Sequence, residues 1–239
     1  MTVWDLQETR TLVRARHGRE QLEIARLSLG STIDRREYAR YHYHEAMELF
    51  DSHIGELHSS QRLFTVILGG NDEDEQDEFH QHLDRIGAHV TACVQSLHAI
   101  ADIFAHAIYY SLGYNLLPSA LSERQISLVP VKKMLSSKRE HVGLAKALGS
   151  LSSHSDFKYL SALANHGKHR SLVRPKLWLH MTDKAPDPYT LQFQQFTYDG
   201  KPYAQRDIRP FLQSEFNRIS VIVVETGNEL NAALRATPL

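Results

Sequence analysis

The feature that most constrains the fold is a stripe of apolar residues near the middle of the chain. Gaps of three and four residues alternate along it, at Leu83, Ile86, Val90, Cys93, Leu97, Ile100, Phe104 and Ala107. This spacing places the side chains on one face of an α-helix, because a helix completes a turn about every 3.6 residues. A seam of this length predicts a helix that packs along other helices, as in a helical bundle.

Two further segments show the same spacing. Residues 31–57 carry an apolar seam, and Ser31 or Thr32 can cap the start of that helix. A preceding helix that includes residues 22–29 is expected to stop at Gly30. Pro210 suits the first turn of a last helix, which is expected to run to the end of the apolar pattern.

Shorter elements are predicted between the long ones. Pro130 is expected to open a helix to about Leu148, and Ser155 to cap another through Asn165. Residues 174–206 are rich in aromatic and β-branched side chains, and Asp199-Gly200 inside them is a hairpin turn signal. We therefore expect a mainly α protein. The predicted architecture is an antiparallel helical bundle with a small β-hairpin insertion at about 174–206 before the last helix, in one domain over 1–239.

An acidic run at residues 71–78 precedes the central helix. Carboxylates oppose the positive end of a helix dipole, so the run favours a helix N-terminus at this point. Gly69 and Gly70, directly before it, are expected to interrupt the chain.

Composition limits the classes of function. The 239 residues include 27 basic and 28 acidic side chains, for a formal net charge of −1. That balance excludes a generally basic nucleic-acid coat but leaves room for a local basic patch, and the 15 histidines make the charge sensitive to mild acid. The single cysteine, Cys93, excludes an internal disulfide and a cysteine-based zinc site, and its place in the seam predicts a buried thiol.

No segment has the pattern of a secretory signal or of a membrane-spanning helix. The first 20 residues lack an apolar core. The longest apolar run, LFTVILGG at 63–70, is far shorter than the roughly 20 residues that cross a bilayer. We therefore expect a soluble cytoplasmic protein that does not associate with membranes.

The stretch LANHGKHRSLV, residues 163–173, gathers the strongest candidate site. Asn165, Lys168, His169 and Arg170 would lie at the end of one helix, with Asn165 and His169 on one face if the helix continues through Gly167. A neutral imidazole beside two cations could act as a general base on a phosphate-bearing substrate. The alternative is an ordinary helix terminus, where basic residues complement the dipole and Gly167 ends the helix.

The segment YLSALANHGKHR resembles the Asn-x-x-Lys-His segment of bacterial HEPN-type proteins, and SLHAIADIFAHAIYYSLG resembles their central helix. The resemblance covers about residues 80–170 and the final helix. It implies a helical bundle, often a homodimer, that binds RNA or cleaves it without a metal ion in a stress or defence system. It also implies that His169 would deprotonate a ribose 2′-hydroxyl or protonate the leaving oxygen, with Lys168 or Arg170 stabilising the charge of the phosphorane.

The chain departs from the arginine, four to six residues, histidine pattern of HEPN ribonucleases. Positions 162–164, where His169 would require the arginine, are Ala162, Leu163 and Ala164. The pattern is met elsewhere, by Arg10 with His17, by Arg35 or Arg36 with His42, and by Arg174 with His180. Arg174 precedes Pro175 and is expected to enter a strand, whereas Arg36 and His42 share a predicted helix. The cluster at residues 165–170 is then either a variant catalytic site or a binding site without cleavage.

Two other groups have metal-capable residue types. One group recurs every four residues on one helix face: His98, Asp102 and His106. These side chains could be metal ligands, could have structural roles, or could support His169 from a neighbouring helix. In the tract Tyr41–Glu45, His42 and His44 would diverge around a helix axis rather than chelate one ion. The sequence has no phosphate-binding loop, dinucleotide fingerprint, zinc-protease motif or nucleophile elbow, so we expect no cofactor.

Two main hypotheses of function remain, beside a third option, a histidine-bound metal site. The first is RNA binding or metal-independent RNA cleavage by a HEPN-like homodimer. The second is a helical interaction or regulatory subunit that binds a partner protein and has no chemistry of its own. The absent arginine favours the second, and the Asn-Lys-His-Arg cluster favours the first.

Overall fold

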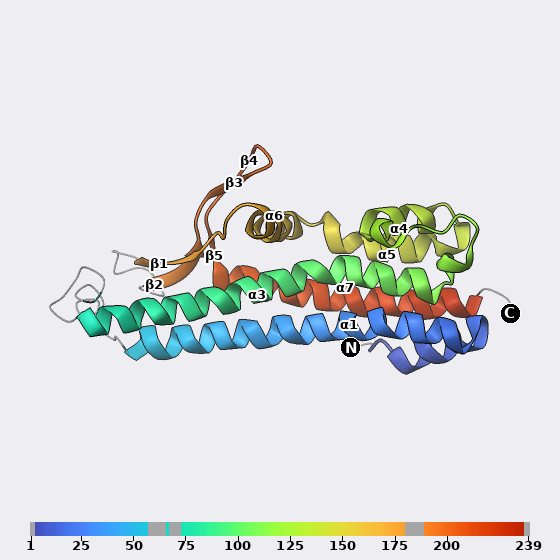
Figure 1. Cartoon of the computed structure of the whole chain (residues 1–239), viewed down its shortest axis with the longest axis horizontal. Coiled ribbons are helices and arrows are strands. Elements are labelled where there is room, and N and C mark those ends of the chain that lie inside the picture. The colour runs from blue at the N-terminus through green and yellow to red at the C-terminus, as the bar shows by residue number, and fades with distance from the viewer. Residues whose placement is uncertain (1–2, 57–65, 67–72, 180–188, 237–239) are drawn as a thin grey trace. The chain divides into compact units, whose positions relative to one another are not determined.

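A computed structural model describes residues 3–56, 66, 73–179 and 189–236 (Figure 1). These residues are mainly helical, with a small antiparallel sheet before the last helix, as the sequence predicts. The six helices among them are α1 (Leu6–Glu56), α3 (Glu73–Ser111), α4 (Leu128–Ser136), α5 (Val142–Ser153), α6 (Ser155–His169) and α7 (Ile208–Ala236). None of the described helices is long and apolar enough to cross a membrane.

Helix α3 confirms the central stripe. Its seam from Ile86 onward is fully buried, at Ile86, Val90, Cys93, Leu97, Ile100, Phe104 and Ala107. The acidic run provides the first turn, where Glu73, Asp74 and Glu75 oppose the dipole. Burial raises the pKa of the Cys93 thiol to about 12, so this side chain stays a neutral apolar group.

The predicted break at Gly30 is wrong. Helix α1 runs through Gly30, and its hydroxyls bond within the helix instead of capping it: Ser31 donates to the Leu27 carbonyl at 2.8 Å and Thr32 to the Ser28 carbonyl at 2.9 Å. Leu29 and Thr32 are fully buried, so packing outweighs the cost of about 1 kcal/mol for a helical glycine. The helix is interrupted at Gly18 instead, where φ is 85°.

The predicted helix from Pro130 to Leu148 is two helices. Pro130 is the third residue of α4, where its missing N–H needs no partner. A 3₁₀ turn at Arg139–His141 then separates α4 from α5. The turn brings the buried His141 ring to the Tyr114 hydroxyl, at 2.7 Å, and this long-range contact has no local signal in the sequence.

The strands confirm the predicted β element and extend it by one residue. Strands β1 (Pro175–Leu179), β2 (Tyr189–Phe193) and β5 (Arg206–Asp207) form an antiparallel sheet in the order β1-β2-β5. Strands β3 (Phe196–Tyr198) and β4 (Lys201–Tyr203) form a hairpin. Asp199 and Gly200 both take positive φ, 51° and 71°, which is the geometry that a two-residue hairpin turn requires.

The chain divides into two compact units. Unit 1 comprises Met1–Glu37, Ser96–Lys158 and Phe216–Leu239, and unit 2 comprises Tyr38–Gln95 and Tyr159–Glu215. Helices α1, α3, α6 and α7 each contribute residues to both units. The assignment of 1–239 to one domain stays a prediction.

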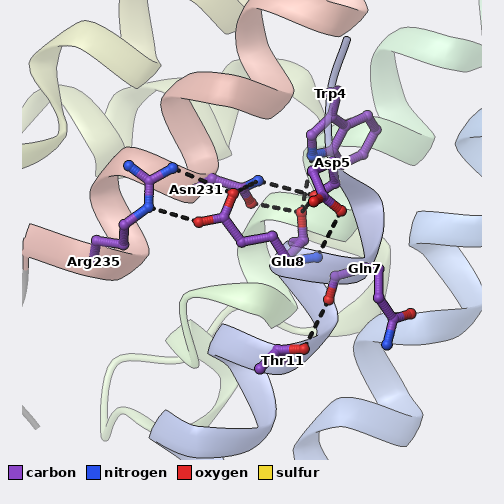
Figure 2. Close-up of polar contacts among 8 residues, drawn as sticks. Trp4, Asp5, Gln7, Glu8, Thr11, Asn231 and Arg235 are labelled. Atoms are coloured by element: carbon purple, nitrogen blue, oxygen red, sulfur yellow. Dashed lines mark hydrogen bonds and ion pairs between the residues drawn. The ribbon is translucent and has the colours of Figure 1, made fainter.

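In unit 1, a buried polar network joins the start of α1 to the end of α7 (Figure 2). The Thr9 hydroxyl lies 2.6 Å from Asn231 Oδ1 and accepts the Trp4 indole N–H at 2.9 Å. Asn231 Nδ2 donates to the Asp5 carbonyl at 3.0 Å and to Glu8 at 3.1 Å. Every polar atom of the Asn231 amide is thus paired, which lets a buried amide sit among apolar side chains.

Candidate functional site at the end of helix α6

Helix α6 continues through Gly167 to His169, so the polar stretch does occupy the last turns of a helix. Leu160, Leu163 and Ala164 are buried, and Lys168, His169 and Arg170 are exposed. The predicted Ser155 cap is replaced by His154, whose Nδ1 accepts the Asp156 N–H at 3.3 Å.

The chain makes a tight return directly after the helix. The His166 carbonyl accepts the N–H groups of Arg170 and Ser171, at 2.9 and 3.1 Å. A Cβ at position 167 would lie 3.4 Å from Leu172 Cδ2, which is about van der Waals contact. Gly167 therefore lies inside the helix and does not end it.

His166 is the member of this stretch that the sequence reasoning missed. Its Nδ1 lies 2.5 Å from the Ser171 carbonyl oxygen. Because a carbonyl only accepts, Nδ1 must carry the proton in this contact, and the lone pair of a neutral His166 is then on Nε2. The residue therefore holds one defined tautomer.

The aromatic side chains of the β3–β4 hairpin lie beside this end of α6. Phe196 and Tyr198 meet the His166 ring edge to face, with ring centres 5.7 and 6.2 Å apart. The Arg170 guanidinium lies 5.2 Å from the centre of the Tyr198 ring, a cation–π contact. Tyr203 stacks on Phe196 at 4.9 Å, as the cross-strand register requires.

A sequence signal for this aromatic face exists in retrospect. Phe196 and Tyr198 alternate along β3, and Tyr203 pairs directly with Phe196 across the Asp199-Gly200 turn. Alternate residues of a strand share one face, so these three rings had to lie together. What the sequence could not show is that this face meets the end of α6.

The four predicted residues do not form a hydrogen-bonded cluster. Asn165 Nδ2 donates to the Ser161 hydroxyl of the same helix, at 3.2 Å. Arg170 turns to Tyr198, while Lys168 and His169 extend into solvent. The structure thus brings His166 and Arg170 together with the hairpin and leaves His169 at the exposed end of the helix.

A groove of about 800 Å³ adjoins the segment that follows α6. One wall is the α3 face that includes His80, Asp84 and Gln95, and the other is the chain from Leu172 to Lys176. The Arg174 guanidinium lies 3.8 Å from the Asp84 carboxylate, and both side chains are mostly exposed. Arg174 and Lys176 add two cations to those of α6 in unit 2.

The second group of predicted residues has structural contacts. Asp102 accepts the N–H of Leu128, at 2.9 Å, at the first residue of α4. His98 stacks on Phe157 at 6.0 Å, and the His106 ring lies 6.1 Å from that of Tyr110. Within the described parts of the chain, the ligand atoms of His98, Asp102 and His106 do not gather within reach of one ion.

The residues of the Tyr41–Glu45 tract diverge, as the helical context predicts. His42 Nδ1 lies 3.0 Å from His89 Nδ1 on α3. His44 lines a separate groove with Glu48 and Arg209. No single ion could therefore be held by His42 and His44.

The remaining arginine–histidine matches differ in context. The Arg36 guanidinium pairs with Glu37 at 3.1 Å. The His17 ring packs on the positive-φ Gly113, and burial lowers its pKa, with the Arg16 charge as the second cause. Arg174 precedes β1, as predicted, and His180 lies outside the described residues.

Comparison of the chain with protein-family models, with curated proteins and with solved structures finds no match.

Proposed function

We propose that the protein binds RNA through the end of α6 and the β3–β4 hairpin, as a HEPN-like helical protein. One observation carries the proposal: the exposed Lys168, His169 and Arg170 follow one another at the end of α6, where Arg170 and His166 contact the aromatic rings of the hairpin. Cations of this kind attract phosphates, and aromatic faces attract bases. The two together are the usual composition of an RNA-binding surface.

The overall charge is consistent with a local site. With a formal net charge of −1, the chain has no general attraction for nucleic acid. The cations Lys168, Arg170, Arg174 and Lys176 fall within nine residues of unit 2. A local patch of this size would give binding that weakens as salt increases, because phosphate contacts release counterions.

Cleavage without a metal ion is the more specific form of the proposal. His169 would take the proton of a ribose 2′-hydroxyl, whose oxygen attacks the adjacent phosphorus while the next ribose oxygen leaves. Lys168 or Arg170 would stabilise the negative charge of the phosphorane, and a protonated imidazole would supply the leaving oxygen's proton. In a homodimer of antiparallel bundles, two such sites would lie near the same RNA strand.

A specific observation favours the non-catalytic alternative. Asn165 bonds to Ser161 rather than to His169, and α6 has no arginine before its polar end. The exposed cluster would then bind a partner protein or RNA without cleaving it. The candidate partner surface is the same end of α6, so the same variants test both functions.

The test of binding uses fluorescence anisotropy with a labelled RNA pool at two salt concentrations. We expect Lys168→Ala and Arg170→Ala each to weaken binding and to lower the salt slope by about one. Lys133→Ala, which removes an exposed cation from α4, is the matched control and should bind as the wild type does. Equal binding by all four proteins would overturn the assignment of the site.

The test of cleavage uses the same pool in EDTA, with wild type beside His169→Ala and His166→Ala. Products that form with the wild type and vanish in His169→Ala would support His169 as the base. If cleavage were lost only in His166→Ala, the general base would be His166, beside the hairpin, instead of His169. Bound but intact RNA with all three proteins would favour the non-catalytic function.

A further inference from the structure

Two imidazoles of unit 2 share a contact that requires a particular protonation state. His42 on α1 and His89 on α3 approach with their Nδ1 atoms 3.0 Å apart, at the distance of a hydrogen bond. In a hydrogen bond one nitrogen must carry the proton and the other must offer its lone pair. The contact therefore holds while at least one ring is neutral, and it is lost when both are protonated.

The surroundings leave few charges to compensate for a second proton. Burial lowers the pKa of His42 first, the charge of His89 lowers it further, and Glu45, one turn along α1, raises it. On α3 the nearest fixed charge by helical spacing is Arg85, one turn before His89, which is also a cation. The Tyr41 ring touches both imidazoles edge to face, at 5.2 and 6.2 Å, and carries no charge.

A second histidine contact lies between the same two helices. His53 on α1 stacks on His82 on α3, with ring centres 3.2 Å apart. Here Glu78 lies 3.6 Å from His82 Nε2 and can pair with a protonated ring. His42–His89 is the contact in which two ring nitrogens face each other at hydrogen-bond distance, so its geometry is the one that depends on a shared proton.

The geometry favours a proton rather than a metal ion at His42–His89. A stable zinc-type site needs three or four ligands. Among the described residues, no third histidine, cysteine or carboxylate atom gathers with these two nitrogens. A shared proton, in contrast, satisfies both Nδ1 atoms as they stand.

We infer that the α1–α3 contact of unit 2 is an acid-sensitive latch, held at neutral pH by the proton shared between His42 and His89 and released when both rings are protonated. The inference is independent of RNA binding. It implies that the packing of these two helix segments responds to pH between about 5 and 7, where histidines titrate.

The test follows the imidazole nitrogens by NMR between pH 8 and 4.5, in the full chain. We expect His42 and His89 to titrate as a coupled pair, the second proton binding at least about tenfold more weakly than the first. His80→Gln, at an exposed position on the same helix, is the control and should leave the signals of the pair unchanged. Two independent single-step titrations for His42 and His89 would overturn the inference.

Thermal unfolding provides the readout of the latch. Between pH 7.5 and 5.5 we expect the Tm of the wild type to fall by about 3 °C more than that of His89→Gln, whose side chain cannot take a proton. His42→Gln should behave as His89→Gln does, and His80→Gln as the wild type does. An equal fall in Tm for all four proteins would contradict a latch at this contact.

Discussion

Polar groups meet between helices in both units, but they are satisfied in different ways. In unit 1 the Asn231 network pairs groups whose donors and acceptors are fixed at every moderate pH. In unit 2 the His42–His89 contact depends on one proton. The difference shows that a buried amide sets a permanent register between two helices, whereas a histidine pair sets a conditional one.

The largest expected effect comes from breaking the permanent network. Asn231→Leu removes the three hydrogen bonds of the buried amide, to the Thr9 hydroxyl, the Asp5 carbonyl and Glu8. We expect a loss of about 3 kcal/mol in the free energy of unfolding, because each such bond contributes about 1 kcal/mol. Denaturant unfolding measures it, with Asn228→Leu, one turn earlier on α7, as the control outside the network. Equal losses for the two variants would refute the role of the network.

A second change tests how tightly the start of α1 packs on the end of α7. Gly227 on α7 faces the Trp4 indole, and an added Cβ would collide with that ring. Gly227→Ala should therefore cost about 2 kcal/mol, although alanine is the better helix former. The variant Gly30→Ala is the natural comparison, and chemical unfolding of both shows whether the cost is steric.

The pH dependence of the free energy of unfolding distinguishes the Asn231 network from the His42–His89 contact. Burial lowers the pKa values of His42, His17 and His141 below the unfolded value of about 6.5. The unfolded chain then binds more protons than the folded one, so stability is full above pH 6.5 and falls as the pH drops below it.

We expect this loss to be present at pH 5.5 and absent at pH 7.5. The cost of Asn231→Leu should be the same at pH 7.5 and at pH 5.5, because its network has no histidine. The cost of His89→Gln should shrink in acid. Denaturant unfolding of the wild type, Asn231→Leu and His89→Gln at both pH values measures these costs. If the cost of Asn231→Leu changed with pH, the amide network would not differ from the histidine contact in its dependence on pH.

The smallest expected effect is a gain. Gly30 lies inside α1 with nothing within 4 Å of an added Cβ, and its φ is not positive. Gly30→Ala should raise the free energy of unfolding by about 0.5–1 kcal/mol, because alanine loses less backbone entropy in a helix. A measured decrease in the free energy of unfolding would show that Gly30 is strained or that other atoms lie close to it, in contradiction to the open space around this position.

The candidate site was partly predictable. The exposed Lys168, His169 and Arg170, the buried Leu160 and Leu163, and the Asp199-Gly200 turn follow from local spacing, and the structure has them in place. His166 was not found, because its role arises from Ser171 and from rings of the hairpin some 30 residues later. Nothing in the helical pattern distinguishes His166 from His169.

By itself the sequence determined the long seam of α3, the mainly helical class and the position of the hairpin, because periodicity and turn chemistry act over a few neighbouring residues. Only the tertiary structure decided that α1 passes through Gly30 and is interrupted at Gly18. It also paired Thr9 with Asn231 and His42 with His89, which are 222 and 47 residues apart. Such contacts depend on which faces of the helices meet in the core. Burial of apolar side chains contributes more free energy than helix propensity does, so local propensity does not determine these contacts.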